Sequence, residues 1–259
     1  MSLIPRKHTA RVAHIARIAG ISLLVLSAAV FSGCASRYIT PGPKADLQVL
    51  APPSIQEGFD TKPSKPFPAG IATVRIQASG YENFNTRKTG AVYGSGRYSI
   101  ITTKEVGEQE QFERIAKLPK VQGIIGLNRM LLPEHLSSLQ DLRASAAQLH
   151  ADLLLVYTFE TKFLDNNSSM PLTVITLGLS PTRKITAVTT VSALLIDTRT
   201  GFIYSAYEST EREQKLSTSW GSQESADKAR QQTESRAFEK LVDEVVASWP
   251  QLLKRHAAK

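Results

Sequence analysis

Seven prolines spread over residues 35–68 confine the folded part of this chain to the residues that follow. They are Pro41, Pro43, Pro52, Pro53, Pro63, Pro66 and Pro68. Because proline fixes φ and removes a backbone donor, we predict neither a helix nor a central strand in this stretch. A polyproline-like chain advances by about 3.1 Å per residue, so the stretch could reach ~100 Å. We interpret it as a disordered tether, in which Leu47, Val49 and Leu50 leave room for a short segment that docks on the folded domain.

The residues before the tether have the pattern of a secretory leader. Residues 1–17 contain four basic side chains and no acidic one, and an apolar run occupies residues 21–31. Counted from Ile18, the apolar stretch has about 14 residues, whereas a membrane-spanning helix needs ~20. We therefore predict a signal peptide over residues 1–33 and treat a permanent transmembrane anchor as the alternative.

The only cysteine, Cys34, follows this leader directly. The segment from Phe31 to Cys34 (Phe-Ser-Gly-Cys) resembles a bacterial lipobox. That resemblance implies diacylglyceryl transfer to the Cys34 sulfur, cleavage before Cys34 and acylation of the new amine. Since Ala35 and not Asp comes next, it also implies the outer membrane. The alternative is an ordinary signal peptide with an incidental cysteine, and a lone thiol excludes an intramolecular disulfide framework.

Much of the positive charge belongs to the leader. Loss of residues 1–33 lowers the formal net charge from +8 to +4. A charge of this size gives no reason to expect a nucleic-acid partner. The residues beyond the tether are numerous enough for one domain with a substantial core.

Alternating and helical patterns predict one α+β domain over residues 69–259, after a lipidated linker over residues 34–68. We expect a mostly antiparallel sheet of five to six strands packed against two to three helices. Strands are expected at residues 71–77, 98–103, 151–161, 171–179, 184–197 and 202–212, and helices at 108–118, from 137 and at 222–255. The runs 171–179 and 184–197 are predicted to form a hairpin.

Several local signals refine this prediction. Ser137 and Gln140 have the spacing of a capping box. In the strand at 151–161, Leu153 and Leu155 fall on one face and Leu154 on the other, so we expect its first half to be buried on both sides. Residues 165–169 are expected to be a loop, and residues 197–201 (Asp-Thr-Arg-Thr-Gly) a tight turn.

The runs AAQLHADLLLVYTFETKF and VSALLIDTRTGFIYSAYEST, followed by a long C-terminal helix, carry a family resemblance. The chain resembles the exported α/β domain of the curli secretion channel lipoprotein, the Tol-type N-terminal domain and the lipoprotein activators of penicillin-binding proteins. The resemblance implies this architecture and no functional residue. In the curli channel, amphipathic hairpins form a shared barrel, so an oligomeric pore that inserts the hairpin 171–197 in the outer membrane is an alternative.

The sequence contains no recognisable catalytic constellation. His135, His150 and His256 are far apart, and neither a zinc motif nor a phosphate-binding loop is present. We predict no catalytic residue, no metal ligand and no cofactor, and Cys34 as the one modification site. The predicted function is a lipid-anchored, non-catalytic accessory domain facing the periplasm, which assists cell-envelope assembly or secretion through an unknown protein partner. A cryptic envelope hydrolase, with convergent carboxylates or a Ser–His pair in a pocket, is a further alternative.

Overall fold

The computed structural model describes residues 42–47, 54–64, 67–167, 183–217 and 222–257. The chain divides into two units, Met1–Arg37 and Tyr38–Lys259. The first unit contains Cys34 and the predicted signal peptide, and it lies outside the described residues. The fold belongs to the second unit.

A seven-stranded sheet forms the centre of this unit, in the order β2-β4-β1-β7-β8-β9, with β5 also paired to β1. Its strands are β1 (Ala69–Ala78), β2 (Val92–Tyr93), β4 (Tyr98–Ile101), β5 (Val121–Gly126), β7 (Leu153–Asn167), β8 (Arg183–Asp197) and β9 (Ile203–Ser217). β1 runs parallel to β5 and β7, and the other pairs are antiparallel. β3 (Ser95–Gly96) and β6 (His135–Leu136) form a separate two-stranded sheet. The predicted α+β class is confirmed, with one strand more in the main sheet than expected.

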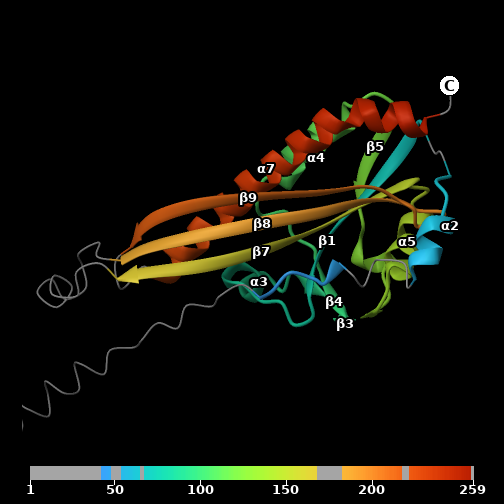
Figure 1. The fold of residues 1–259 in the computed structure, drawn as a ribbon. Helices are drawn as coiled ribbons and strands as arrows, with labels where there is room; N and C mark the ends of the chain where they lie inside the picture. The colour runs from blue at the N-terminus through green and yellow to red at the C-terminus, as the bar shows by residue number, and fades with distance from the viewer. Residues whose placement is uncertain (1–41, 48–53, 65–66, 168–182, 218–221, 258–259) are drawn as a thin grey trace, which may run out of the picture. The chain divides into compact units, whose positions relative to one another are not determined.

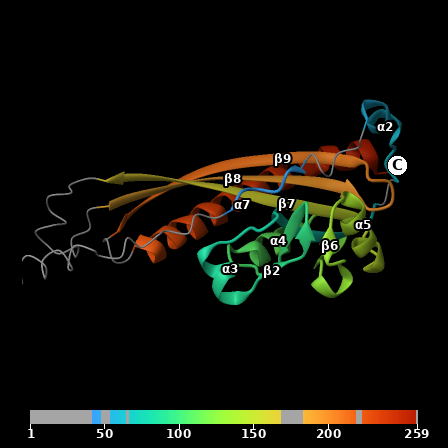
Figure 2. The same cartoon turned by 90° about the horizontal axis from the view of Figure 1, so that it is seen from below.

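Helices cover both faces of the sheet (Figures 1 and 2). α7 (Ser222–His256) and α4 (Glu108–Ala116) pack on one face, and α5 (Leu139–Gln148) packs on the other. The described residues also contain the short helices α2 (Ile55–Asp60) and α3 (Phe84–Thr89) and the 3-10 turn Arg129–Leu131. This is more helix than predicted, because α2 and α3 are single capped turns without the periodicity of a longer helix.

The alternation of β7 creates two hydrophobic cores. Leu153, Leu155, Tyr157 and Phe159 enter the core under α4 and α7, together with Phe238 and Trp249. Leu154 and Val156 enter the second core, under α5. The prediction that the first half of this strand is buried on both faces is confirmed.

The expected hairpin partner of β8 was wrong. β8 pairs with β7 from Leu153↔Asp197 to Asn167↔Arg183, and it pairs with β9 on its other edge. Both edges of β8 are therefore occupied by strands other than residues 171–179, and residues 168–182 lie outside the described residues. Residues 165–167, expected in a loop, extend β7 instead. A local pattern shows that a segment is extended but does not identify its neighbour.

Two expectations for residues 35–68 also need correction. Residues 55–60 form α2, because no proline falls between Pro53 and Pro63 and the Ser54 hydroxyl accepts from the Glu57 N–H. Residues 42–47 lie on the sheet, where Lys44 bridges to Gln77 of β1. We call residues 42–47 the strap. The docking segment allowed for in this region is therefore present at Leu47, although it begins earlier, and Val49 and Leu50 lie outside the described residues.

The structure tests the predicted capping box and the predicted tight turn. The capping box of α5 uses Ser138 and Asp141, one residue later than predicted. In the turn after β8, Asp197 accepts hydrogen bonds from the backbone N–H groups of Arg199 and Thr200, and Gly201 has a φ of 80°. The predicted tight turn is confirmed, because a positive φ of this size suits glycine.

Candidate functional site

β1 and β7 separate beyond Val74, and polar side chains occupy the opening. The parallel pairing of the two strands ends at Val74↔Val156. From there the Gln77 side chain replaces the backbone ladder. Its Nε2 donates to the Phe159 carbonyl (3.1 Å), and its Oε1 accepts from the Phe159 N–H (3.2 Å) and from the Thr158 hydroxyl. The sheet thus stays hydrogen-bonded across a gap that backbone groups alone do not close.

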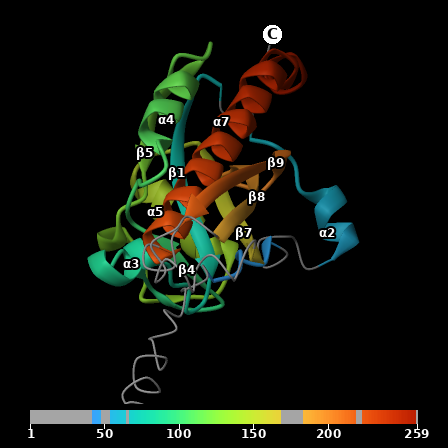
Figure 3. The same cartoon turned by 90° about the vertical axis from the view of Figure 1, so that its left-hand side faces the viewer.

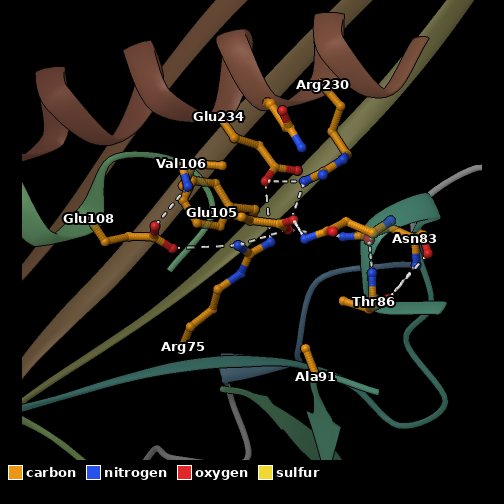
Figure 4. Close-up of polar contacts among 12 residues, drawn as sticks. Arg75, Asn83, Thr86, Ala91, Glu105, Val106, Glu108, Arg230 and Glu234 are labelled. Atoms are coloured by element: carbon orange, nitrogen blue, oxygen red, sulfur yellow. Dashed lines mark hydrogen bonds and ion pairs between the residues drawn. The ribbon is translucent and has the colours of Figure 1, made fainter. Parts of the chain in front are cut away.

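A buried charge cluster fills the α7 side of this opening (Figure 4). It consists of Arg75 from β1, Glu105 from the loop before α4, Glu108 at the first position of α4, and Arg230 and Glu234 from α7. Nη2 of Arg75 lies 3.2 Å from Glu234, and its Nη1 lies 3.6 Å from Glu105 and from Glu108. Arg230 Nη1 lies 2.8 Å from Glu234 and 3.1 Å from Glu105. The two guanidinium groups therefore share Glu105 and Glu234, and the cluster joins β1, the start of the α4 region and α7.

Helical spacing brings the α7 members of the cluster together. Asp227, Arg230 and Glu234 follow one another at steps of three and four, which is one face of a helix. Asp227 accepts from Arg230 Nε at 2.9 Å. Asn83, which caps α3, donates to Glu105 at 3.2 Å and so ties that helix to the cluster. α3, α4 and α7 are thus held together over the gap in the sheet.

Burial and neighbouring positive charge shift the pKa values of Glu105 and Glu108 in opposite directions. Burial raises the pKa of Glu108 above its usual value, although Arg75 and the Val106 N–H oppose the shift. Burial alone would also raise the pKa of Glu105, but the positive charges of Arg230 and Arg75 outweigh it and lower that pKa. At neutral pH the burial of ionised Glu108 is therefore less favourable than that of ionised Glu105.

The cluster has convergent carboxylates but not the setting of an acid–base site. Each carboxylate faces a guanidinium, and Glu108 and Glu234 are 0 % exposed. Nε of Arg75 and Nη2 of Arg230 are buried without a hydrogen-bond partner among the described residues. What this arrangement can do is pair charges and hold helices in place.

The strap lies on the opposite face of the sheet. Its Ala45 is 1 % exposed, and the Ala45 N–H donates to the Thr158 hydroxyl at 3.1 Å. Lys44 pairs with Glu160 at 3.6 Å, and the Gly42 N–H donates to the Glu82 carbonyl at 3.1 Å. The strap is therefore fixed to β1, β7 and the segment before α3.

A groove of about 500 Å³ separates the strap from the neighbouring strands. It is lined by residues 44–47, by residues 192–194 of β8 and by residues 206–208 of β9. Leu194 and Ala206 contribute apolar surface, and Ser192 donates to Glu208 at 2.9 Å. The groove opens on the face of the sheet that α7 does not cover.

β9 forms the outer edge of the sheet next to this groove (Figure 2). It has 15 residues and pairs with β8 along them. No strand within the described ranges pairs with its other edge. On the face away from α7, Ala206, Glu208, Thr210 and Arg212 are exposed at alternate positions.

The structure places the sequence-predicted residues as follows. Cys34, the one predicted site residue, lies outside the described residues. His135 and His150 are exposed, and His256 packs against the rings of Phe202 and Tyr204, so the three do not converge. Within the described part of the chain, no group of three His, Cys, Asp or Glu side chains could hold a metal ion.

Sequence reasoning missed the charge cluster. The available signal was Arg75 and Gln77 within an otherwise apolar strand, together with the buried face of α7 that carries Ala226 and Ala229 beside Arg230. Such charges are rarely fully buried unless they are paired. The pattern shows that partners are needed but not where they are.

Comparisons with known proteins give distant likenesses in structure. No family model matches the chain, and no curated protein matches it. A DUF330-family protein of Xanthomonas campestris is similar at 9% identity, with a TM-score of 0.37, over 74% of this chain and 93% of that one. Lipoprotein GNA1162 of Neisseria meningitidis is similar at 11% identity, with a TM-score of 0.33, over 56% of this chain and 83% of that one. Protein CT253 of Chlamydia trachomatis is similar at 11% identity, with a TM-score of 0.32, over 72% of this chain and 99% of that one.

These TM-scores are too low for a conclusion about the function of this chain. The similar structures include a lipoprotein, and the resemblance to the curli channel lipoprotein stays a prediction. None of the helices in the described ranges combines the length and the apolar character needed to cross a membrane.

Proposed function

We propose that this chain is a non-catalytic binding domain of the bacterial cell envelope, held at a membrane by lipid on Cys34. In this proposal it captures an extended segment of a partner protein along the outer edge of β9. The observation that carries the proposal is a 15-residue edge strand, unpaired on one side among the described residues, beside a groove of about 500 Å³.

An edge of this kind suits strand addition. An added strand forms main-chain hydrogen bonds along the edge, and every second side chain of that strand contacts the adjoining surface, which determines specificity. Here that surface is the groove floor at Leu194 and Ala206, with Glu208 at its side. The charges of Glu208 and Arg212 on the same strand disfavour unselective pairing between edges.

The two alternative functions receive less support from the packing. A pore would expose the apolar face of β8 to lipid, but Ala187, Val191, Ala193 and Leu195 of that face are buried, the last three in the core under α7. A hydrolase would need carboxylates free to exchange protons with a substrate, and those of the charge cluster are buried against arginines.

Site-specific crosslinking in intact cells tests the proposal. A photo-crosslinking residue is placed at Ala206, beside the groove, and the matched control is Glu239 on the exposed side of α7. We expect position 206 to form an adduct with one extended segment of a partner, which mass spectrometry identifies. A synthetic peptide of that segment should then slow amide hydrogen exchange in β9. The same peptide with a central proline should not, because proline lacks the N–H that a ladder needs. Equal adducts at both positions, or protection elsewhere than in β9, would refute strand addition.

A further inference from the structure

The acidic side chains in the second half of β9 lie on the face of the sheet that α7 covers. They are Glu211 and Glu213, and they pair with Lys240 and Arg236 of that helix. Figure 3 shows α7 lying along β9 and β8 on this face. Both carboxylates therefore have a positive partner within the same copy of the chain.

The other face of β9 carries one acidic and one basic side chain, Glu208 and Arg212, and both are exposed. Glu208 accepts a hydrogen bond from the Ser192 hydroxyl at 2.9 Å. Neither Glu208 nor Arg212 forms an ion pair with another residue that the structure describes. Because side chains alternate along a strand, both point to the same face, with Thr210 midway between them. Two opposite charges without an ion partner are thus placed symmetrically about Thr210.

Antiparallel pairing of two β9 edges would give each of these charges a partner. In a two-fold dimer the same surface of both copies meets, so residue i contacts residue j and residue j contacts residue i. With the axis at Thr210, Glu208 of each copy lies opposite Arg212 of the other. Unlike charges directly opposite each other on neighbouring strands stabilise the pair. Thr210 is also the midpoint of Ile203–Ser217, so this register matches the two strands end to end.

The neighbouring registers lack this match. With the axis at Glu208, at Glu211 or at Arg212, that residue lies opposite the same residue of the second copy, and like charges meet. With the axis at Ser209, Glu208 lies opposite Thr210 and has no ion partner. Like charges directly opposite each other are destabilising. The charge pattern of β9 therefore selects Thr210 as the centre.

The face covered by α7 is compatible with the same register. Glu211 of each copy would lie opposite Ser209 of the other, and Glu213 would lie opposite Tyr207, so no like charges are directly opposed. Because α7 already pairs with both carboxylates, this face brings no uncompensated acidic charge to the contact.

We propose that the segment captured at the β9 edge is β9 of a second copy of this chain, paired antiparallel about a two-fold axis at Thr210. The second copy thereby becomes the partner of the proposed strand addition, on which this inference rests. Charged side chains on an edge strand prevent unselective pairing. Here the same charges select one partner in one register, and the pairing joins the two sheets into one.

A cysteine at the axis tests the register in the full-length chain. Thr210→Cys places two thiols directly opposite each other, where the Cα atoms of an antiparallel pair are about 4.5–5.5 Å apart. A disulfide spans about 4.4–6.8 Å between Cα atoms, so mild oxidation should join two copies. The matched control is Ala206→Cys, an exposed position on the same face of β9. Its two copies would be about 27 Å apart, at eight residues of about 3.4 Å each. Wild type reports any link through Cys34, its only cysteine.

Charge reversal tests the recognition. Glu208→Arg alone, or Arg212→Glu alone, places two pairs of like charges across the axis. We expect the dimer dissociation constant, measured by sedimentation of the full-length protein in detergent, to rise about tenfold or more. The combined variant, Glu208→Arg with Arg212→Glu, restores two unlike pairs and should restore the dimer. Circular dichroism checks that each variant is folded, as expected for two exposed positions.

Three results would overturn the inference. They are wild-type protein that sediments only as a monomer, equal disulfide formation by Thr210→Cys and Ala206→Cys, and a combined charge swap that dimerises no better than the single variants. A disulfide specific to position 210, together with rescue by the charge swap, is the result we expect. A fold defect alone would not produce that rescue.

The outcomes also separate this inference from the proposed function. If the chain is monomeric and the photo-crosslink at Ala206 identifies a different protein, strand addition stands and the second copy is removed as its partner. If the chain is monomeric and the adducts at Ala206 and Glu239 are equal, both proposals fail. An adduct between Ala206 and the segment around Gln214 of a second copy supports both.

Discussion

Glu105 and Glu108 are three residues apart and contact the same guanidinium, yet their surroundings shift them in opposite directions. Glu105 has a lowered pKa because Arg230 and Arg75 overcome the effect of burial, whereas burial prevails at Glu108 and raises its pKa. A lowered pKa means that the folded state holds the proton less tightly than the unfolded state does, and a raised pKa means the reverse. The two residues should therefore give opposite pH dependences of stability.

We expect Glu105→Gln to lower the free energy of unfolding at pH 7 by about 2–3 kcal/mol, because it removes a charge that two arginines share. The contribution of Glu105 is fully present above the pKa of the unfolded chain and is lost as the pH falls below about 4. The difference in the free energy of unfolding between wild type and Glu105→Gln should therefore become smaller in acid. Urea unfolding at a series of pH values measures it, and a deficit that is constant from neutral pH to acid would contradict the assigned shift.

Glu108→Gln should change stability by less than about 1 kcal/mol at pH 7, because it also removes the cost of burying an ionised carboxylate. Wild-type stability linked to Glu108 is present below about pH 4 and declines as the pH rises through the raised pKa. Relative to wild type, the variant should therefore gain stability from acid to neutral pH, the opposite of Glu105→Gln. The same urea series measures both variants, and parallel behaviour would show that the assigned directions are wrong.

Asp197 depends on five donors. Oδ2 accepts from the Ser64 N–H (2.7 Å), the Ser64 hydroxyl (2.6 Å) and the Tyr204 hydroxyl (3.0 Å), and Oδ1 accepts from Arg199 and Thr200. Burial alone would raise the pKa of Asp197, but these hydrogen bonds outweigh burial and lower it.

Asp197→Asn places an amide N–H opposite groups that are already donors, and we expect the free energy of unfolding to fall by about 2–3 kcal/mol. Ser64→Ala, which removes one donor, is the milder comparison, at about 1 kcal/mol. The contribution of ionised Asp197 to the free energy of unfolding is lost as the pH falls through its lowered pKa. The denaturant unfolding curves of wild type and Asp197→Asn should therefore converge in acid.

At the scale of elements, the gap between β1 and β7 depends on one amide side chain. Gln77 satisfies both the N–H and the carbonyl of Phe159, which are buried. Gln77→Leu leaves both groups without a partner, and we expect a loss of about 2–4 kcal/mol in thermal or denaturant unfolding. Gln77→Glu still accepts from the Phe159 N–H but, when ionised, cannot donate to the Phe159 carbonyl. At acidic pH the protonated carboxyl can donate, so this variant should lose less stability there than at neutral pH. Equal stability of wild type and Gln77→Leu would show that the strands close without the side chain.

The elements also show where sequence reasoning succeeds and where it ends. Leu153 to Phe159 revealed a strand buried on two faces, because alternation depends only on which residues meet a core. The partner of β8 was assigned wrongly, because alternation fits β7 and residues 171–179 equally well. Likewise the sequence marks Arg75 as a charge in an apolar strand, but its partner Glu234 is 159 residues away. Long-range pairing of this kind has no local signature.

At the scale of the whole molecule, the strap fastens the described segment before α2 to the sheet through contacts of residues 42–45. Ala45 is 1 % exposed and is held by few hydrogen bonds. A charge at this position is costly to bury, and detaching the strap costs less than opening the sheet. Ala45→Glu should therefore release residues 42–47 and uncover part of the second core, to which Ala45 and Leu47 contribute, while the core under α4 and α7 remains intact.

The released strap should be detectable by proteolysis. We expect trypsin to cut Ala45→Glu after Lys44 under conditions in which wild type resists cleavage. The melting temperature should fall by no more than about 8 °C. Ala144→Glu places the same side chain at an exposed alanine of α5 and should leave both measurements unchanged. Resistance at Lys44, or collapse of the whole fold, would mean that the strap is an integral part of the sheet and not a segment docked on it.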